Sequence, residues 1–79
     1  MDWLDKKLGN FCKMIDKEIE QNPFLSRPIK NKFKTMLEDC VSKAKESGNE
    51  TTAEFNRNYR KLERSVAKKG KPLSKKMFV

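Results

Sequence analysis

The sequence has no histidine and only two cysteines, Cys12 and Cys40. A structural zinc site needs about four cysteine or histidine ligands, so we expect no metal centre and no other cofactor. Histidine is also the most versatile acid–base catalyst near neutral pH, and its absence argues against many enzyme mechanisms. We expect the two cysteines to be small buried thiols, with a disulfide between them as the alternative.

The sequence also lacks a long apolar run. Its first residues, MDWLDKKLG, contain nothing that resembles a signal peptide or a membrane span. We therefore expect a protein of the cytoplasm without a membrane span. This agrees with the prediction of free thiols, because that compartment is reducing.

Catalytic patterns are missing as well. The acidic pair Glu38-Asp39 stands on a helix face of mixed charge, and no glycine-rich phosphate loop or activated nucleophile accompanies it. We therefore expect that the protein is not an enzyme.

The chain is short and polar. Its 79 residues make one small domain, in which 35% of the residues are hydrophobic and 38% are charged. Because a chain of this size buries only about 60–65% of its unfolded surface, we expect modest stability. A homodimer or another partner would add to it.

The sequence does contain three segments with apolar residues at helical spacing, which predict helices over about 3–21, 27–46 and 52–69. The apolar stripe of the first segment consists of Leu4, Leu8, Phe11, Cys12, Ile15 and Ile19. The stripe of the second consists of Ile29, Phe33, Met36, Leu37, Cys40, Val41 and Ala44. The stripe of the third consists of Phe55, Tyr59, Leu62 and Val66.

Residues that start or stop helices separate these segments. Ser26 is a candidate N-cap for the second helix, and Gly48 is a candidate stop for it. Thr51 and Glu54 have the spacing of a capping box at the start of the third helix. Gly70 ends that helix, and the proline that follows prevents it from resuming.

We therefore predict an all-α fold, either a small three-helix bundle or a helical hairpin with a third helix laid across it. Residues 1–70 form the single domain. Residues 71–79, KPLSKKMFV, are too short and too charged to form an element, and we expect a basic, flexible tail. The apolar end of this tail either folds back onto the bundle or anchors a partner.

Positive charge gathers towards the C-terminus. The chain has 19 Lys and Arg against 11 Asp and Glu, which gives a net charge of +8. In the third segment the basic residues cover an arc of about 100°, almost opposite the apolar stripe. This basic ridge consists of Arg57, Arg60, Lys61, Arg64 and Lys68, and it is extended by Lys69, Lys71, Lys75 and Lys76.

The basic ridge differs from the first segment, where acidic and basic residues mix as in an ordinary solvated helix face. A face with nearly one sign of charge is typical of a surface that binds a polyanion. Arginine suits phosphates because its planar guanidinium donates two parallel hydrogen bonds. Asn56 and Asn58 flank the basic ridge and are candidate donors to phosphate or sugar.

We therefore predict a small nucleic-acid-binding protein that contacts mainly the backbone, with RNA slightly favoured over DNA. We find no helix-turn-helix, RRM, KH, zinc-finger or basic-zipper pattern that would read bases. A basic amphipathic helix can also lie on an anionic membrane. The third segment, however, has only four large apolar residues, and the bundle needs them.

The alternative is a different class of protein, a small adaptor or inhibitor that binds an acidic surface of a protein partner. Candidate anchors for such a partner are Trp3, Met77 and Phe78, which could also pack on the protein's own core. In size, in lysine and asparagine content and in its single helical domain, the chain resembles the small accessory proteins of phages and low-GC bacteria. This resemblance implies the cytoplasm of a bacterial cell or of a phage-infected host.

Overall fold

The structure, a computed structural model, describes residues 3–78, and the side chain of Trp3 lies outside the described part. The elements in chain order are α1 (Trp3–Glu20), α2 (Arg27–Glu46), the short 3-10 helix η1 (Gly48–Glu50) and α3 (Thr51–Lys69). No strand occurs between residues 3 and 78. The predicted all-α fold is therefore confirmed, and the helix bounds agree with the predicted ones to within one residue.

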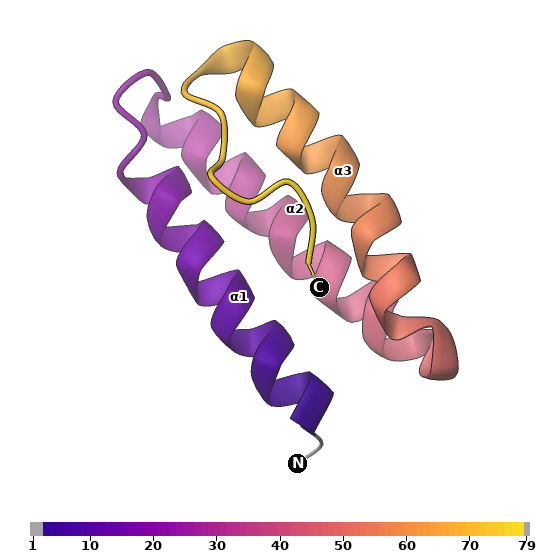
Figure 1. The fold of residues 1–79 in the computed structure, drawn as a ribbon. Helices are drawn as coiled ribbons and strands as arrows, with labels where there is room; N and C mark the ends of the chain where they lie inside the picture. Colours follow the sequence, from indigo (N-terminus) through magenta and orange to yellow (C-terminus); the bar gives the residue numbers. More distant parts are fainter. Residues whose placement is uncertain (1–2, 79) are drawn as a thin grey trace.

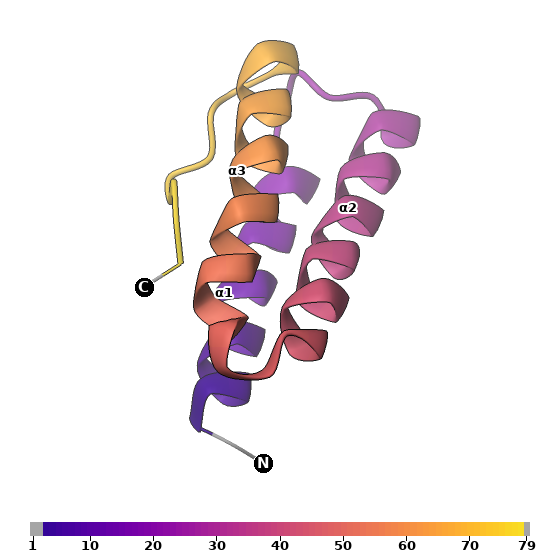
Figure 2. The same cartoon turned by 90° about the vertical axis from the view of Figure 1, so that its right-hand side faces the viewer.

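The three helices form a bundle in which neighbours in sequence run antiparallel (Figure 1). The helix α2 packs against both α1 and α3. The C-terminal segment, residues 71–78, turns back after α3 and runs along the seam between α1 and α3. Figure 2 shows that this segment and α2 lie on opposite sides of α3. The tail therefore covers the face of the bundle that α2 leaves open.

The ends of the helices follow the sequence signals only in part. Ser26 occupies the N-cap of α2 with an extended backbone, although its side chain makes no capping hydrogen bond. Gly48 stops α2 as predicted, because its φ of 62° is in the left-handed region that favours glycine. The capping box is wrong: the Thr51 hydroxyl donates to the carbonyl oxygen of Gly48 at 2.6 Å. Because η1 leads directly into α3, Glu50 is the N-cap, and the helix start lacks a side-chain cap.

The core lies where the three apolar stripes meet, and the aromatic rings form its centre. Phe11 of α1 contacts Phe55 and Tyr59 of α3 edge to face, with ring centroids 5.7 and 5.2 Å apart. Phe78 of the tail completes this aromatic cluster, at 5.3 Å from Phe11 and 5.7 Å from Phe55. Edge-to-face pairs at these distances add to the free energy of burial. The C-terminal segment is thus part of the core.

The tail, which we expected to be flexible, is packed against the bundle over the described residues. Leu73 is 3% exposed and Phe78 is 2% exposed, so burial of these two side chains holds both halves of the segment. Its basic residues point outward, because Lys71, Lys75 and Lys76 are all exposed. Of the two alternatives for the apolar end of the tail, the structure shows the folded-back arrangement.

Side chains of the bundle bind the start of the tail. Asn22, in the α1–α2 connection, donates to the carbonyl oxygen of Lys71 at 2.9 Å and accepts from its N–H at 3.3 Å. Glu18 of α1 accepts from the N–H and the hydroxyl of Ser74 at 2.8 and 2.7 Å. A Cβ atom on Gly70 would lie 2.7 Å from Asn22 Oδ1. The close approach of the chain to Asn22 therefore favours glycine at this position, because a Cβ atom would displace the amide that binds Lys71.

Both cysteines are free thiols, as predicted. Cys40 is buried and Cys12 is partly buried. Burial is the main cause of the raised pKa of both thiols, and the pKa of Cys12 is about 11. Both side chains are therefore protonated near neutral pH and behave as small apolar residues of the core.

Candidate functional site

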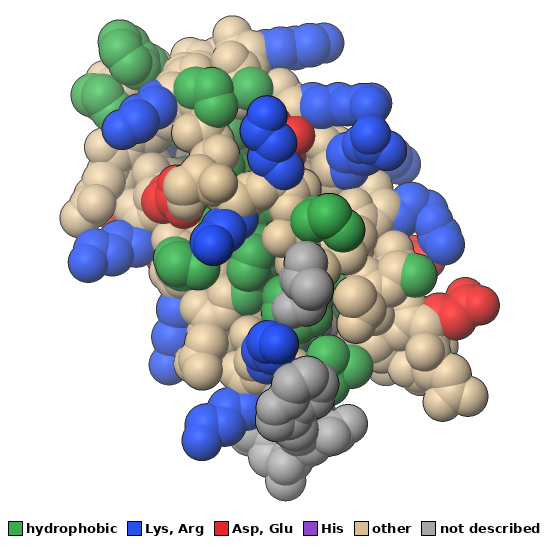
Figure 3. All heavy atoms as spheres, in the orientation of Figure 1, with side chains coloured by type: hydrophobic (Ala, Val, Ile, Leu, Met, Phe, Trp, Pro, Cys, Tyr) green, Lys and Arg blue, Asp and Glu red, His purple; other side chains and the backbone are tan. Residues whose placement is uncertain are grey.

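The basic ridge lies on the outward face of α3. Phe55, Tyr59, Leu62 and Val66 are each fully buried, which fixes the rotation of the helix about its axis. The opposite face is therefore turned to solvent. All five ridge residues are exposed, and so is Lys69 at the end of the helix. Figure 3 shows blue side chains along the α3 side of the face that also carries the tail.

Only one residue of the basic ridge is paired within the described part of the chain. The guanidinium of Arg57 contacts the carboxylate of Glu54, one helical turn before it. The other four, from Arg60 to Lys68, form no ion pair with residues 4–78. Basic residues three or four positions apart on a helix repel one another. The ridge therefore keeps a high positive potential that an anion could neutralise.

The tail brings a further lysine next to the basic ridge. A groove of about 470 Å³ lies between α3 and the tail, which we call the cationic groove. Its lining includes Arg57 and Arg60 from α3 and Lys76 from the tail, with Glu63 as its one acidic residue. The sequence predicted these three basic residues as part of one surface, and the structure brings them together around one groove.

Two residues of α3 hold the tail at this place. The side-chain amide of Asn56 donates to the carbonyl oxygen of Phe78 and accepts from its N–H, both at 2.7 Å. The hydroxyl of Tyr59 donates to the carbonyl oxygen of Lys75 at 2.6 Å. Burial raises the pKa of this hydroxyl well above its usual range, so it remains a donor. These contacts position Lys75 and Lys76 beside the helix.

The predicted role of Asn56 and Asn58 as donors to phosphate finds no support in the structure. Asn56 uses both ends of its amide on Phe78. Asn58 donates to the backbone oxygen of Glu54 at 3.1 Å and to its carboxylate at 3.2 Å. Both amides therefore stabilise the protein itself. The signal that sequence reasoning missed is Tyr59, whose hydroxyl needs a partner when it lies on an apolar stripe.

The three candidate partner anchors have different environments. Met77 is 57% exposed, so it is available for contact with another molecule. Phe78 is instead buried in the aromatic cluster of the protein's own core. The side chain of Trp3 lies outside the described residues, so its predicted role stays a prediction.

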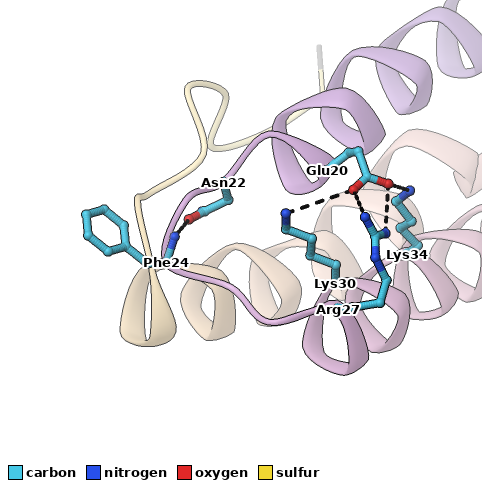
Figure 4. A network of polar contacts seen from close by, with 6 residues as sticks. All are labelled: Glu20, Asn22, Phe24, Arg27, Lys30 and Lys34. Atoms are coloured by element: carbon cyan, nitrogen blue, oxygen red, sulfur yellow. Dashed lines mark hydrogen bonds and ion pairs between the residues drawn. The ribbon is translucent and has the colours of Figure 1, made fainter.

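A second cluster of charges, which the sequence did not predict, joins α1 to α2 (Figure 4). The carboxylate of Glu20 accepts hydrogen bonds from both terminal nitrogens of Arg27, at 2.9 and 2.5 Å, and from Lys34 at 2.6 Å. The ammonium group of Lys30 lies 3.9 Å from the same carboxylate. Hydrogen bonds from Arg27 and then from Lys34 are the main causes that lower the pKa of Glu20 to about 2. We call these four residues the Glu20 cluster.

The described residues include no group of three or more His, Cys, Asp or Glu side chains arranged to hold a metal ion. Nor does any described helix combine the length and apolar content that crossing a bilayer requires. In comparisons with known proteins, the chain matches no family model, no curated protein and no solved structure at a significant level.

Proposed function

We propose that this protein binds nucleic acid, mainly through the phosphate backbone, and that the basic ridge and the tail lysines form the interface. The observation that carries the proposal is the row of exposed cations on α3, of which the four from Arg60 to Lys68 form no ion pair with residues 4–78. A helix face that served only solubility would gain stability by mixing Glu with Lys. Here like charges stand at helical spacing instead, and a polyanion would relieve their repulsion.

The length of the ridge suits a nucleic-acid backbone. From Arg57 to Lys68 the helix rises about 16 Å, at 1.5 Å per residue. A duplex carries one negative charge per about 1.7 Å of its axis, so several phosphates lie within reach of this length. The ridge is therefore long enough to contact more than one phosphate at a time.

The residue types suit phosphates as well. Three of the five ridge residues are arginines, whose planar guanidinium binds phosphate with two hydrogen bonds and also stacks on bases. Stacking on bases requires that they be unpaired, which is common in RNA loops, and we therefore favour RNA slightly over DNA. The interaction we propose is binding without catalysis.

The salt dependence of binding tests this function. Each phosphate contact contributes a slope of about −0.7 for single strands, or −0.9 for duplex DNA, to the logarithm of affinity against the logarithm of salt concentration. Five contacts give about −3.5 to −4.5. We expect that changing Arg60, Lys61 and Arg64 together to Gln reduces the magnitude of the slope by about two to three units. Fluorescence anisotropy with a labelled RNA measures it.

A matched control has the same loss of charge at another place. Lys6, Lys13 and Lys17 are exposed on α1, and their change to Gln also removes three positive charges. We expect a much smaller change in slope for this variant, while circular dichroism shows both variants to be as helical as the parent. Equal losses from the two variants would show that binding follows net charge alone, which would contradict a site on α3.

The alternative function, an adaptor or inhibitor that binds an acidic protein surface, uses the same cations. It is distinguished by a pull-down from cell lysate with and without nuclease treatment. If nucleic acid is the ligand, the purified protein should carry absorbance at 260 nm that high salt removes, and nuclease should abolish the capture of other components. A protein partner that remains bound after nuclease treatment would favour the alternative.

A further inference from the structure

An apolar groove lies on the other side of the tail from the cationic groove. It has a volume of about 510 Å³ and runs between α1 and the tail. Met14 of α1 and Met77 of the tail line it, and they are 42% and 57% exposed. The nearly buried rings of Phe11 and Phe78 also contribute to the lining. Only three large hydrophobic residues are exposed in the described part of the chain, and two of them stand at this groove.

The two grooves are neighbours. Met77 lines both the cationic groove and the apolar groove, so it marks the boundary between them. Lys76 belongs to the cationic groove and Lys75 to the apolar one. A ligand that crosses the tail at Met77 would thus meet Arg57, Arg60 and Lys76 on one side and the exposed Met14, with Lys75 nearby, on the other. Figure 3 shows green side chains around the tail in the middle of this face, with blue side chains beside them.

A ligand that occupies both grooves carries negative charges beside apolar groups. We propose that the two grooves together bind single-stranded nucleic acid. The phosphates lie along the cationic groove, and an unpaired base packs against Met14 and Met77 in the apolar groove. This inference rests on the function proposed above and names its substrate class.

Duplex nucleic acid does not fit both grooves, because its bases are stacked on one another and offer only their edges. The apolar groove would then stay empty. An acidic amphipathic helix is the other class of ligand that carries charge beside apolar groups. It binds through anchors at several successive turns. Here only Met14 and Met77 offer exposed apolar surface, which is enough for one or two bases but not for a row of helical anchors.

The physical basis of the contact is the methionine side chain. Its thioether is polarisable and makes favourable contacts with aromatic rings, and its flexibility lets it adapt to different bases. Stacking of a base on a protein side chain tolerates every sequence, because each base has an aromatic face. We therefore expect a preference for single strands without a strong preference among bases.

The experiment compares three labelled ligands in low salt by fluorescence anisotropy. They are a single-stranded RNA of about 12 nucleotides, its duplex, and an abasic strand with the same number of phosphates. We expect the parent protein to bind the single strand about 10-fold more tightly than the abasic strand, at the low end of the measured range for base stacking. Changing Met14 and Met77 together to Gln should remove this difference and leave the salt slope unchanged.

Phe24 supplies the matched control. Its side chain is 71% exposed and projects away from the bundle at the α1–α2 connection (Figure 4), and it lines neither groove. Phe24→Gln removes a similar apolar surface, and we expect it to keep the full preference for the single strand. A measurement on the unmodified protein is independent of any variant. Photocrosslinking with 4-thiouridine in the RNA should label the peptides that contain Met14 or Met77.

The outcomes separate this inference from the proposed function. If the duplex and the abasic strand bind as tightly as the single strand, with a slope that depends on the basic ridge, the phosphate interface stands and the base site is wrong. Crosslinks confined to α3 would also overturn the base site. If none of the three ligands binds in a salt-dependent manner, the proposed function fails as well. Tighter binding of an acidic amphipathic peptide than of the single strand would replace both with a protein partner.

Discussion

Two groups of positive charge in this protein are arranged in opposite ways. In the Glu20 cluster, three cations from α2 surround one carboxylate of α1, with nitrogen–oxygen distances between 2.5 and 3.9 Å. On the basic ridge, Arg57 contacts the carboxylate of Glu54, and the other four cations form no ion pair with residues 4–78. The same residue types therefore connect two helices in one place, and in the other most of them have no ion-pair partner among residues 4–78.

The difference shows that the role of a charged side chain depends on the partners it has within the protein. Each cation of the Glu20 cluster already has a carboxylate oxygen within 3.9 Å, so a ligand would have to compete with an existing contact. The ridge cations from Arg60 to Lys68 exchange only water for an anion when a ligand binds. We therefore expect the Glu20 cluster to affect stability and the basic ridge to affect binding.

The largest effect should come from the tail, which attaches lysines to the ridge through a core residue. Phe78→Ala removes a ring that is 2% exposed and contacts two other rings. We expect a loss of about 3–5 kcal/mol in the free energy of unfolding, the usual cost of this change in a core. Urea denaturation followed by circular dichroism measures it. Met77→Ala, at a 57% exposed side chain, is the control and should have little effect.

Equal unfolding curves for Phe78→Ala and the parent would show that the tail contributes little to stability. The tail lysines could then not be held beside α3, and the cationic groove would lose one of its walls. Only the ridge residues on α3, without the tail lysines, would then be compared with the Glu20 cluster.

The parts of the fold that the sequence predicted are those with local causes. The three helices follow from apolar residues at helical spacing, and the basic ridge follows from the same periodicity on the opposite face of α3. Gly48 stops α2 because the left-handed backbone there favours glycine over other residues. In each case, residues within a few positions of one another decide the outcome.

Most of the parts that the sequence did not predict depend on residues farther apart in the chain. Asn22 binds Lys71 across 49 positions, and Asn56 binds Phe78 across 22. In the sequence alone, an asparagine beside the basic ridge is equally suited to donate to a phosphate or to another part of the protein. Only the docked tail shows that Asn56 is already occupied. The Glu20 cluster likewise crosses the connection between two helices, where counting along one helix cannot find it.

A smaller effect separates the two groups of charge by stability. Changing Arg60, Lys61 and Arg64 to Gln removes like-charge neighbours on one helix face, and each relieved pair should add about 0.2–0.5 kcal/mol to stability. The corresponding change of Arg27, Lys30 and Lys34 to Gln removes the three cationic partners of Glu20 and should lower the melting temperature. Thermal denaturation of both variants, with RNA binding measured in parallel, tests the expectation.

The expected result is a crossed pattern between the two triple variants. The ridge variant should lose RNA binding and keep or gain stability, and the cluster variant should lose stability and keep most of its binding. Both variants remove three positive charges, so net charge cannot produce this difference. A ridge variant that melts clearly below the parent would show that the ridge cations are structural, and the comparison would fail.

The smallest effect is expected from Glu20→Gln and appears as a change in pH dependence. Glu20 has a pKa of about 2 in the folded protein, below its ordinary value of 4.5, because Arg27 and Lys34 donate hydrogen bonds to its charged form. A carboxylate with a lowered pKa stabilises the fold above about pH 4.5 and loses that contribution as pH falls towards 2. The difference in melting temperature between parent and variant should therefore be greatest near neutral pH and vanish towards pH 2.

The difference should also be modest, because the Glu20 side chain is 37% exposed and water screens its contacts. Glu46→Gln, at an exposed carboxylate without an ion pair in residues 4–78, is the matched control for the change of Glu to Gln. If the difference for Glu20→Gln stayed constant across this range, Glu20 would act through its size and not through its charge, and the Glu20 cluster would not be an electrostatic counterpart to the ridge.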